Sequence, residues 1–231
     1  MKERVVDFNQ IVREYLAGKF PLEKISPLDN LNSFNFLTIA GYVRGESCLF
    51  RSDSRIGKLA FSSITLNGII NTTLGIACSE SCYDIPVLIF EKTELPRIIT
   101  FTYIDFIPLS KTSEYQEKYI EPLKPISKDL AYIPGRNNSF RESLGSPYSF
   151  SGFFKRHHKF SVGVALERYL GLWVNFLENA MPINSPEYDK EIKSNRQKLA
   201  NEFSFSENSN KFLDLMLGKY FTKRLLKEIF L

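Results

Sequence analysis

The dipeptide Asn67-Gly68 constrains the fold of this chain more than any other pair of residues. It separates two β-rich runs, residues 58–66 and 69–78. An Asn-Gly pair is the strongest short-range signal for a β-hairpin, because both turn positions must take positive φ. Further β-rich runs lie close by, at residues 42–50, 85–90 and 97–106. Strands with such short connections must pair antiparallel, since parallel pairing needs a long crossover.

Helical patterns flank this β-rich region on both sides. Apolar residues recur at helical spacing in the first eighteen residues, in 113–129, in 162–177 and in 212–231, and residues 186–203 predict a charged surface helix. Residues 21–40 carry two prolines and predict a loop, and one more strand is expected near 148–156. We therefore expect one domain over residues 1–231, of the α/β (α+β) class. Its architecture would be a three-layer α/β/α sandwich with a central antiparallel sheet flanked by helices.

Composition and charge exclude several classes of function. The net charge of +4 is too small to indicate a nucleic-acid partner. Three cysteines argue against a disulfide framework and for a reducing compartment. The chain has no signal-peptide pattern and no apolar run of membrane-spanning length. We expect a soluble, monomeric protein without a membrane partner, cytoplasmic or, if organelle-encoded, in the plastid stroma.

Several short motifs occur in order along the C-terminal three quarters of the chain. They are Tyr-Asp-Ile-Pro at 83–86, Asp-x-x-Pro-Leu at 105–109, Tyr-x-x-Lys-Tyr-x-x-Pro at 115–122, an aromatic-x-Arg strand end at 154–156, and a closing Gly-plus-helix pattern at 218–231. Their order and spacing over roughly residues 56–231 resemble the ferredoxin-dependent bilin reductases. The segment Glu-Pro-Leu-Lys-Pro at 121–125 is similar to the phycoerythrobilin:ferredoxin oxidoreductase and phytochromobilin synthase branches of phycobilin biosynthesis.

This resemblance implies a fold and an activity. The family folds as an α/β/α sandwich and reduces linear tetrapyrroles such as biliverdin with electrons from reduced ferredoxin, through radical intermediates. The implied activity is that of an oxidoreductase acting on CH–CH groups with an iron–sulfur protein as donor. The family binds neither flavin nor metal. The residues agree, because no dinucleotide fingerprint follows a strand and no cluster has metal-ligand spacing.

Two glutamates stand where the family has important aspartates, and the resemblance assigns catalysis to both. They are Glu91, after the apolar run 87–90, and Glu207, eleven residues before Gly218. Protonating a tetrapyrrole radical requires a carboxylic acid held against an apolar ring, with its pKa raised so that it donates near neutral pH. The alternatives are that Glu91 opens an exposed turn over 91–94 and pairs with Lys92 or Lys111, and that Glu207 lies in a polar loop ahead of the last helix.

Four further residues are assigned to substrate binding. Leu74 stands where the family has Asn or His, Phe90 precedes Glu91, and Asp105 lies in the Asp-x-x-Pro-Leu motif. Arg156 offers a planar fork suited to a substrate propionate. For Asp105 and Arg156 the alternatives are a turn-stabilising carboxylate and a surface cation.

The sequence is compatible with three hypotheses of function. The leading one is a bilin reductase, with red chlorophyll catabolite reductase, a relative that uses Glu as an acid, as a variant. The second is a non-catalytic tetrapyrrole binder or carrier, motivated by Leu74 and by both aspartate-to-glutamate changes. The third is an unrelated α/β protein that uses its sheet as a partner surface. Basic clusters at 155–159 and 219–227 are either solvated surface or a docking face for ferredoxin.

Overall fold

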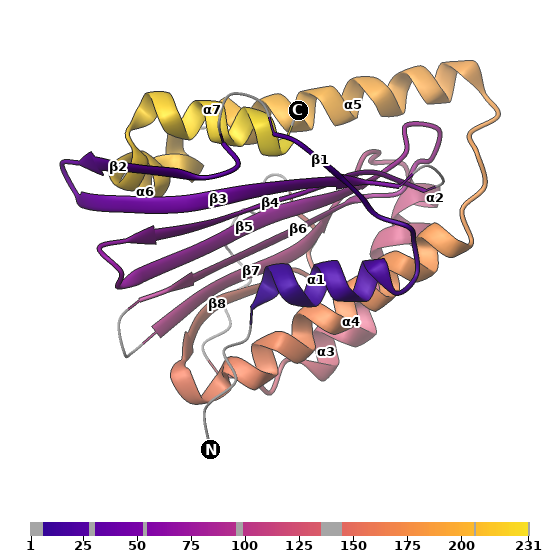
Figure 1. The fold of residues 1–231 in the computed structure, drawn as a ribbon. Helices are drawn as coiled ribbons and strands as arrows, with labels where there is room; N and C mark the ends of the chain where they lie inside the picture. The colour runs from indigo at the N-terminus through magenta and orange to yellow at the C-terminus, as the bar shows by residue number, and fades with distance from the viewer. Residues whose placement is uncertain are drawn as a thin grey trace.

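A sheet of eight strands forms the middle layer of the protein (Figure 1). The computed structural model describes residues 7–27, 31–52, 55–95, 99–134, 145–205 and 207–230, apart from the side chains of residues 99, 156, 204–205 and 207–210. From β3 to β8 each strand pairs antiparallel with the next, and β1 and β2 both pair with β3. The strands are β1 (Glu23–Ile25), β2 (Phe34–Thr38), β3 (Gly41–Arg51), β4 (Ile56–Leu66), β5 (Ile70–Ser79), β6 (Val87–Glu94), β7 (Ile99–Ile107) and β8 (Phe150–Lys155).

Helices cover both faces of this sheet, so the predicted three-layer sandwich is confirmed (Figure 1). One face carries α1 and α4, and the other carries the C-terminal helices α5, α6 and α7. The helices are α1 (Phe8–Ala17), α2 (Ser113–Tyr115), the π-helical turn η1 (Gln116–Ile120), α3 (Leu123–Asp129), the 3-10 turn η2 (Arg156–His158), α4 (Lys159–Glu178), α5 (Pro186–Phe205), α6 (Glu207–Leu217) and α7 (Lys219–Phe230). Among the described residues, no helix is both long and apolar enough to cross a membrane.

The Asn-Gly hairpin forms as predicted. Asn67 and Gly68 have φ values of 52° and 68°, and the Ile69 N–H donates to the Leu66 carbonyl at 3.0 Å. The Asn67 side chain also accepts a hydrogen bond from the Tyr42 N–H at 2.8 Å, which joins this turn to the start of β3. The hairpin therefore fixes both the antiparallel pairing of β4 with β5 and the position of the neighbouring turn.

Two expectations about the ends of the chain are wrong. Residues 21–40 are not all loop, since β1 and β2 form there as short strands on the edge of β3. The rings of Phe34 and Phe36 pack on Phe221 of α7, with centroids 4.8 and 4.7 Å away, and this packing outweighs the loop-forming residues around them. Near the C-terminus, α6 begins at Glu207, so that residue starts a helix and does not lie in a loop.

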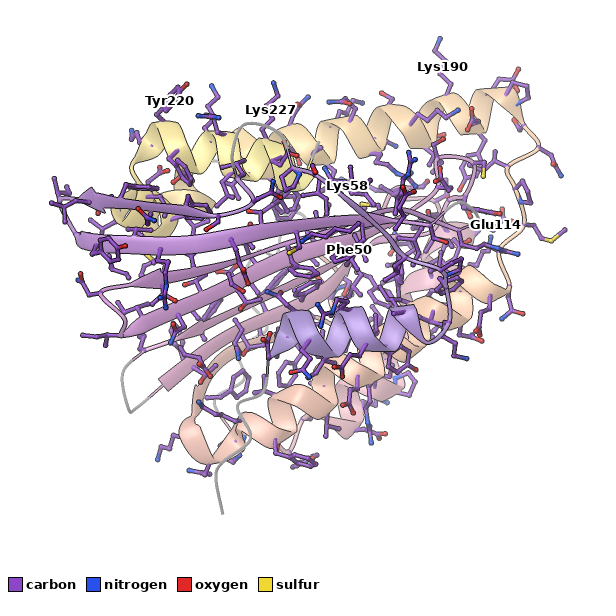
Figure 2. The ribbon with its side chains drawn as sticks, viewed as in Figure 1. Phe50, Lys58, Glu114, Lys190, Tyr220 and Lys227 are labelled. Carbon is purple, nitrogen blue, oxygen red and sulfur yellow. The ribbon has the colours of Figure 1, made fainter. Side chains whose placement is uncertain are left out.

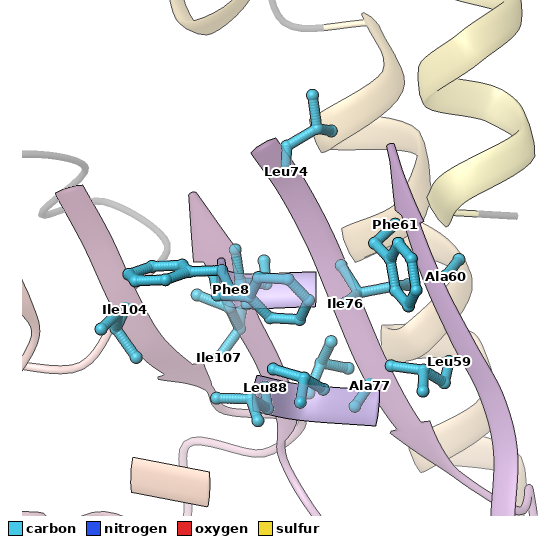
Figure 3. Packing of buried hydrophobic residues seen from close by; sticks show 14 of the residues in the cluster. Phe8, Leu59, Ala60, Phe61, Leu74, Ile76, Ala77, Leu88, Ile104 and Ile107 are labelled. Carbon is cyan, nitrogen blue, oxygen red and sulfur yellow. The ribbon is translucent and has the colours of Figure 1, made fainter. Parts of the chain in front are cut away.

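The alternation of side chains along β6 separates the two layers of the core. The Phe90 ring lies against Phe8 of α1 at 6.5 Å, and the buried Trp173 of α4 donates to the Pro86 carbonyl at 2.9 Å. Figure 3 shows Phe8 within this packed layer and Leu74 on the side of the C-terminal helices. Because side chains alternate along a strand, Phe90 and Glu91 point to opposite faces of the sheet.

Candidate functional site

Leu74 and Glu91 lie directly opposite each other on neighbouring strands. The β5–β6 register pairs Leu74 with Glu91, and the β6–β7 register pairs Glu91 with Tyr103. Directly opposite side chains in an antiparallel pair lie on one face with their Cβ atoms about 5 Å apart. Leu74 and Tyr103 are buried and Glu91 is half-buried. The structure thus brings together two residues that the sequence assigned to one site from positions seventeen residues apart.

The alternative in which Glu91 opens an exposed turn is wrong. β6 continues through Glu91 to Glu94, and Lys92 points to the opposite face, where its ammonium lies 5.3 Å from the centre of the Phe8 ring. There Glu94 forms ion pairs with Lys92 at 3.5 Å and with Lys159 at 2.9 Å. Glu91 is therefore held by the strand on the side of the C-terminal helices.

A small cavity lies between Leu74, Glu91 and the C-terminal helices. Its volume is about 20 Å³, which is room for about one water molecule. Apolar side chains from all three helices form the side that faces the carboxylate: Phe203 from α5, Leu213 from α6, and Leu226 and Phe230 from α7. The arrangement places the half-buried Glu91 carboxyl group beside apolar side chains, where it can contact a ligand that enters between the sheet and the helices.

A larger groove lies next to this cavity along α5. It measures about 470 Å³ and runs between the end of β7 and α5, with Ile107, Pro108 and Leu109 on one side and Leu199 on the other. Leu199 lies one helical turn from Phe203, which lines the cavity. Charged side chains form the rim of the groove: Lys111, Glu191, Lys198 and Glu202. The volume is within the range of small-molecule sites in proteins.

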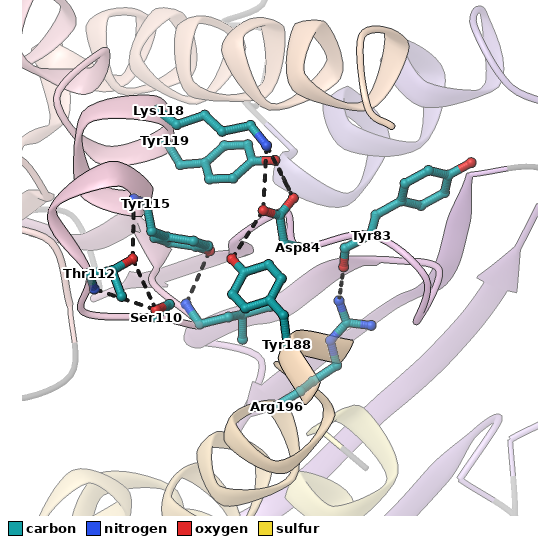
Figure 4. Close-up of polar contacts among 10 residues, drawn as sticks. Tyr83, Asp84, Ser110, Thr112, Tyr115, Lys118, Tyr119, Tyr188 and Arg196 are labelled. Carbon is teal, nitrogen blue, oxygen red and sulfur yellow. Dashed lines mark hydrogen bonds and ion pairs between the residues drawn. The ribbon is translucent and has the colours of Figure 1, made fainter. Parts of the chain in front are cut away.

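Buried polar contacts hold α5 at this end of the sheet (Figure 4). The Asp84 carboxylate accepts hydrogen bonds from the hydroxyls of Tyr119 and Tyr188, the latter at 3.2 Å, and pairs with Lys118 at 3.4 Å. Burial, and then the Asp84 charge, raise the pKa of the Tyr188 hydroxyl, so it stays protonated and donates at neutral pH. The Tyr-Asp-Ile-Pro and Tyr-x-x-Lys-Tyr motifs meet in this cluster.

Two more side chains of α5 bind backbone carbonyls of the sheet. Arg196 donates to the carbonyls of Ser79 and Tyr83, both at 3.1 Å, and Asn195 donates to the Leu109 carbonyl at 3.0 Å. These contacts fix α5 over the turns that follow β5 and β7. Asn195 and Leu109 both line the groove, so their contact helps to set its width.

Asp105 is fully buried in β7 and is the centre of a hydrogen-bonded group. Its carboxylate accepts from the Tyr103 hydroxyl at 3.0 Å, from the Phe106 N–H at 2.8 Å, and from the N–H of Ser146 at 2.7 Å and its hydroxyl. Burial raises the pKa of Asp105 to about 7, although these hydrogen bonds oppose the shift. The carboxylate thus joins the segment around Ser146 to the strand that carries Tyr103 opposite Glu91.

Phe90, Arg156 and Glu207 are the remaining predicted site residues. The Phe90 ring points into the other face and would clash with a side chain at Gly75, whose added Cβ would lie 2.4 Å from it. Phe90 is a fully buried core residue that also lines the cavity beside Glu91, and its assignment to substrate binding stays a prediction. Arg156 begins η2 directly after β8, and Glu207 begins α6, but both side chains lie outside the described part of the structure. Their assignments stay predictions.

The residues that close the cavity cannot be identified from the sequence patterns. Leu213 belongs to a helical pattern visible in the sequence, but spacing does not say which turn of which helix lies over Glu91. Tyr103 was also missed, because its relation to Glu91 depends on strand register. Figure 2 shows how densely side chains fill the layer between the sheet and α7. Within the described ranges, no group of three or more His, Cys, Asp or Glu residues could hold a metal ion.

Comparison with known proteins gives a structural match and no sequence match. No protein-family model matches the chain, and no curated protein matches it in sequence. Among solved structures, the chain is similar to phytochromobilin synthase from tomato, crystallised in complex with biliverdin, with a TM-score of 0.78. The similarity covers 96% of this chain and 82% of that one at 16% sequence identity. It shows that this chain has the bilin reductase fold.

Proposed function

We propose that this protein binds a linear tetrapyrrole of the biliverdin or dihydrobiliverdin type between its sheet and α5–α7, and reduces it with electrons from ferredoxin. The observation that carries the proposal is the cavity in which Glu91 faces apolar side chains of all three C-terminal helices. The likeness to a phytochromobilin synthase bound to biliverdin supports it, because that protein has the same fold. The motifs at 83–86 and 105–122 add nothing to the assignment of function, since their residues hold the fold together.

Glu91 is the proton donor in this proposal. Reduction of a carbon–carbon double bond takes two electrons, one from each of two reduced ferredoxins, and two protons, one from Glu91 and one from solvent water. A half-buried carboxylic acid beside Leu74 and Phe203 stands where it can give a proton to a ring carbon of the bound radical. Glu supplies the same acid as the family's Asp on a side chain that is one methylene longer, so the carbon that receives the proton can differ from that in the family.

A tetrapyrrole is much larger than the cavity beside Glu91. Binding therefore requires α6 and α7 to move away from the sheet, while the polar contacts of Tyr188, Asn195 and Arg196 keep the first half of α5 in place. The apolar side of the groove continues the cavity along α5 and can accept one end of an elongated ligand. This movement breaks the hydrogen bonds that Lys58 donates to the Glu228 carbonyl of α7 and that Thr38 donates to the Met216 carbonyl of α6. Apolar contacts with the ligand then replace those of the two helices with the sheet.

Ferredoxin docks on α7 in this proposal. The two basic clusters predicted as docking segments lie on opposite faces of the sheet, with α7 on one and the start of α4 on the other (Figure 1). Only α7 also lines the cavity, through Leu226 and Phe230. A donor bound there delivers electrons over the shortest path to a ligand beside Glu91. The protein needs no flavin or metal of its own, because ferredoxin supplies single electrons.

One observation favours a second candidate, a tetrapyrrole carrier without reductase activity. Leu74 places an apolar side chain directly opposite Glu91, where the bilin reductase family has Asn or His. Here Glu91 is present but the Asn or His opposite it is not, so the site can bind the ligand and still fail to deliver the second proton. The red chlorophyll catabolite reductase-like variant differs only in the tetrapyrrole.

Visible absorption separates these candidates. Biliverdin is mixed with the purified protein, its spectrum is recorded, and reduced ferredoxin is then added. The proposal expects a spectral shift on mixing and a new product after ferredoxin is added. A shift without any later change indicates the carrier. If no shift occurs with biliverdin or with a linear chlorophyll catabolite, the protein does not bind tetrapyrroles and the proposal fails.

A further inference from the structure

Five large apolar side chains are exposed together at one end of the sheet. Their exposed fractions are 99% for Ile39, 79% for Leu37, 58% for Leu215, 53% for Ile69 and 50% for Tyr42. Single exposed apolar residues are common on protein surfaces, but a cluster marks a surface that meets something apolar. We call these five residues the apolar tip.

Hydrogen bonds bring the three segments of the apolar tip together. The Asn67 side chain donates to the Ala40 carbonyl at 3.2 Å, which joins the turn before β5 to the turn between β2 and β3. The Thr38 hydroxyl donates to the Met216 carbonyl at 3.1 Å, which joins β2 to the end of α6. Figure 1 shows these turns at one end of the molecule, at its left edge. Residues separated by up to 178 positions thus form one feature.

The apolar side chains lie on both sides of the end of the sheet. Leu37 and Tyr42 are directly opposite each other on β2 and β3, on the face away from Phe36, which packs on α7. Leu215 lies on the opposite face, on α6, and Ile39 lies at the turn between the two. A single flat partner surface could cover one of these sides but not both.

Basic residues flank the apolar tip on both sides as well. Arg44 lies two residues from Tyr42 on the same face of β3, and Lys211 lies one helical turn from Leu215 on α6. Both side chains are exposed, and neither forms an ion pair with another residue of the described part of the chain. On this face of β3, Arg44 lies nearer to the tip than Glu46, so the first charge behind the apolar residues is positive, whereas on α6 Asp214 accompanies Lys211.

We propose that the apolar tip inserts end-on into the surface of an anionic membrane. A lipid surface surrounds an inserted projection, so it can contact apolar side chains on both faces at once, and its headgroups then lie at the height of Arg44 and Lys211. Apolar burial and attraction to anionic lipid together set the strength of such surface binding. The sequence predicted no membrane partner because it lacks a membrane-spanning segment. Binding to the membrane surface needs no such segment, so this proposal replaces that prediction.

Flotation with lipid vesicles tests this proposal on the full chain. Wild type should float with vesicles of phosphatidylglycerol and phosphatidylcholine, and more weakly with phosphatidylcholine alone. The variant Leu37→Ser/Ile39→Ser should lose at least about tenfold in vesicle affinity, because two apolar side chains no longer leave water. Arg44→Gln and Lys211→Gln should each lose about fivefold on the anionic vesicles only.

Met181→Ser is the matched control, since Met181 is also a highly exposed apolar residue but lies outside the tip. It should bind vesicles as wild type does, and thermal unfolding followed by circular dichroism reports that all variants are folded. Failure of wild type to float, or wild-type flotation of Leu37→Ser/Ile39→Ser, overturns the proposal. Light scattering gives a further test. If wild type is a dimer that does not bind vesicles, and Leu37→Ser/Ile39→Ser is a monomer, the tip contacts a second copy of the chain and the proposal is overturned. None of these outcomes depends on reductase activity.

Discussion

Leu74 and Glu91 face each other across β5 and β6, on the side of the sheet that carries the C-terminal helices. The pair sets one carboxylic acid beside one apolar side chain, and apolar residues of α5, α6 and α7 close the space above them. This relationship connects the fold to the proposed chemistry. Substitutions of Leu74 should therefore affect both the stability of the protein and the pH dependence of reduction.

Replacing Leu74 by Asn should lower the free energy of unfolding by about 2–4 kcal/mol, because a buried leucine is lost and an amide is desolvated. Leu74→Met, which conserves volume, should cost less than about 1.5 kcal/mol. An amide that hydrogen-bonds to a carboxylate favours its ionised form. Reduction by Leu74→Asn should therefore decline at a lower pH than reduction by wild type. Urea unfolding and pH–rate profiles measure both effects, and equal unfolding midpoints for all three proteins would contradict the packing of Leu74.

Asp105 should make stability depend on pH between about 4 and 7. Its pKa is raised from 3.8 to about 7 by burial, so the unfolded chain loses this proton first as pH rises. The stabilising contribution of the protonated group is complete below about pH 4 and is lost as pH rises through 7. Relative to Asp105→Asn, wild type should lose on the order of 4 kcal/mol of unfolding free energy between pH 4 and pH 8. If the difference in unfolding free energy between wild type and Asp105→Asn stays constant from pH 4 to pH 8, the raised pKa of Asp105 is contradicted.

Tyr188→Phe should loosen α5 without changing the chemistry at Glu91. Removing a hydroxyl that donates to the buried Asp84 carboxylate should lower the free energy of unfolding by about 1.5–3 kcal/mol. Tyr132→Phe, at an exposed position, should change it by less than about 0.5 kcal/mol. Hydrogen exchange should also rise in the amides of α5. If exchange rises no more than in Tyr132→Phe, the Asp84 cluster does not anchor this helix.

Lys227→Glu should weaken the interaction with ferredoxin. Lys227 projects into solvent from α7, on the helix that we propose as the docking element (Figure 2). The Michaelis constant for ferredoxin should rise about threefold to tenfold at low salt, and less at higher salt, where the screening length falls to about 8 Å. Lys190→Glu, on the exposed side of α5, is the matched control and should have a smaller effect. Equal effects of the two variants would move the docking face away from α7.

Local sequence patterns predicted most of the fold because the features that determine it are local. The positive φ values at Asn67-Gly68 and the short connections between runs require antiparallel pairing, whatever the rest of the chain does. β1 and β2 were missed because edge strands need only one partner, and the packing of Phe34 and Phe36 on Phe221 comes from residues far along the chain.

The candidate site could be predicted only in part. The resemblance placed Leu74 and Glu91 together, but strand alternation, once known, separated Phe90 from them. The helix residues that close the cavity depend on how α6 and α7 pack, which the helical spacing of the sequence does not determine. The motifs at 83–86 and 115–122 meet at Asp84 and hold η1 and α5 on the sheet, so they predict the fold better than the chemistry.

The most direct test of the account is the reduction of biliverdin by Glu91→Gln with ferredoxin as the electron donor. The variant keeps the shape of the side chain, so it should bind biliverdin with the wild-type spectral shift. It should then stop at a radical or semi-reduced spectrum and form product at least about a hundredfold more slowly, because positioned proton donation contributes at least that much. Glu91→Asp should retain activity or change which isomer forms, and Glu114→Gln, on an exposed side chain, should behave as wild type (Figure 2). Wild-type turnover by Glu91→Gln would show that Glu91 is not the proton donor, and would contradict the central claim.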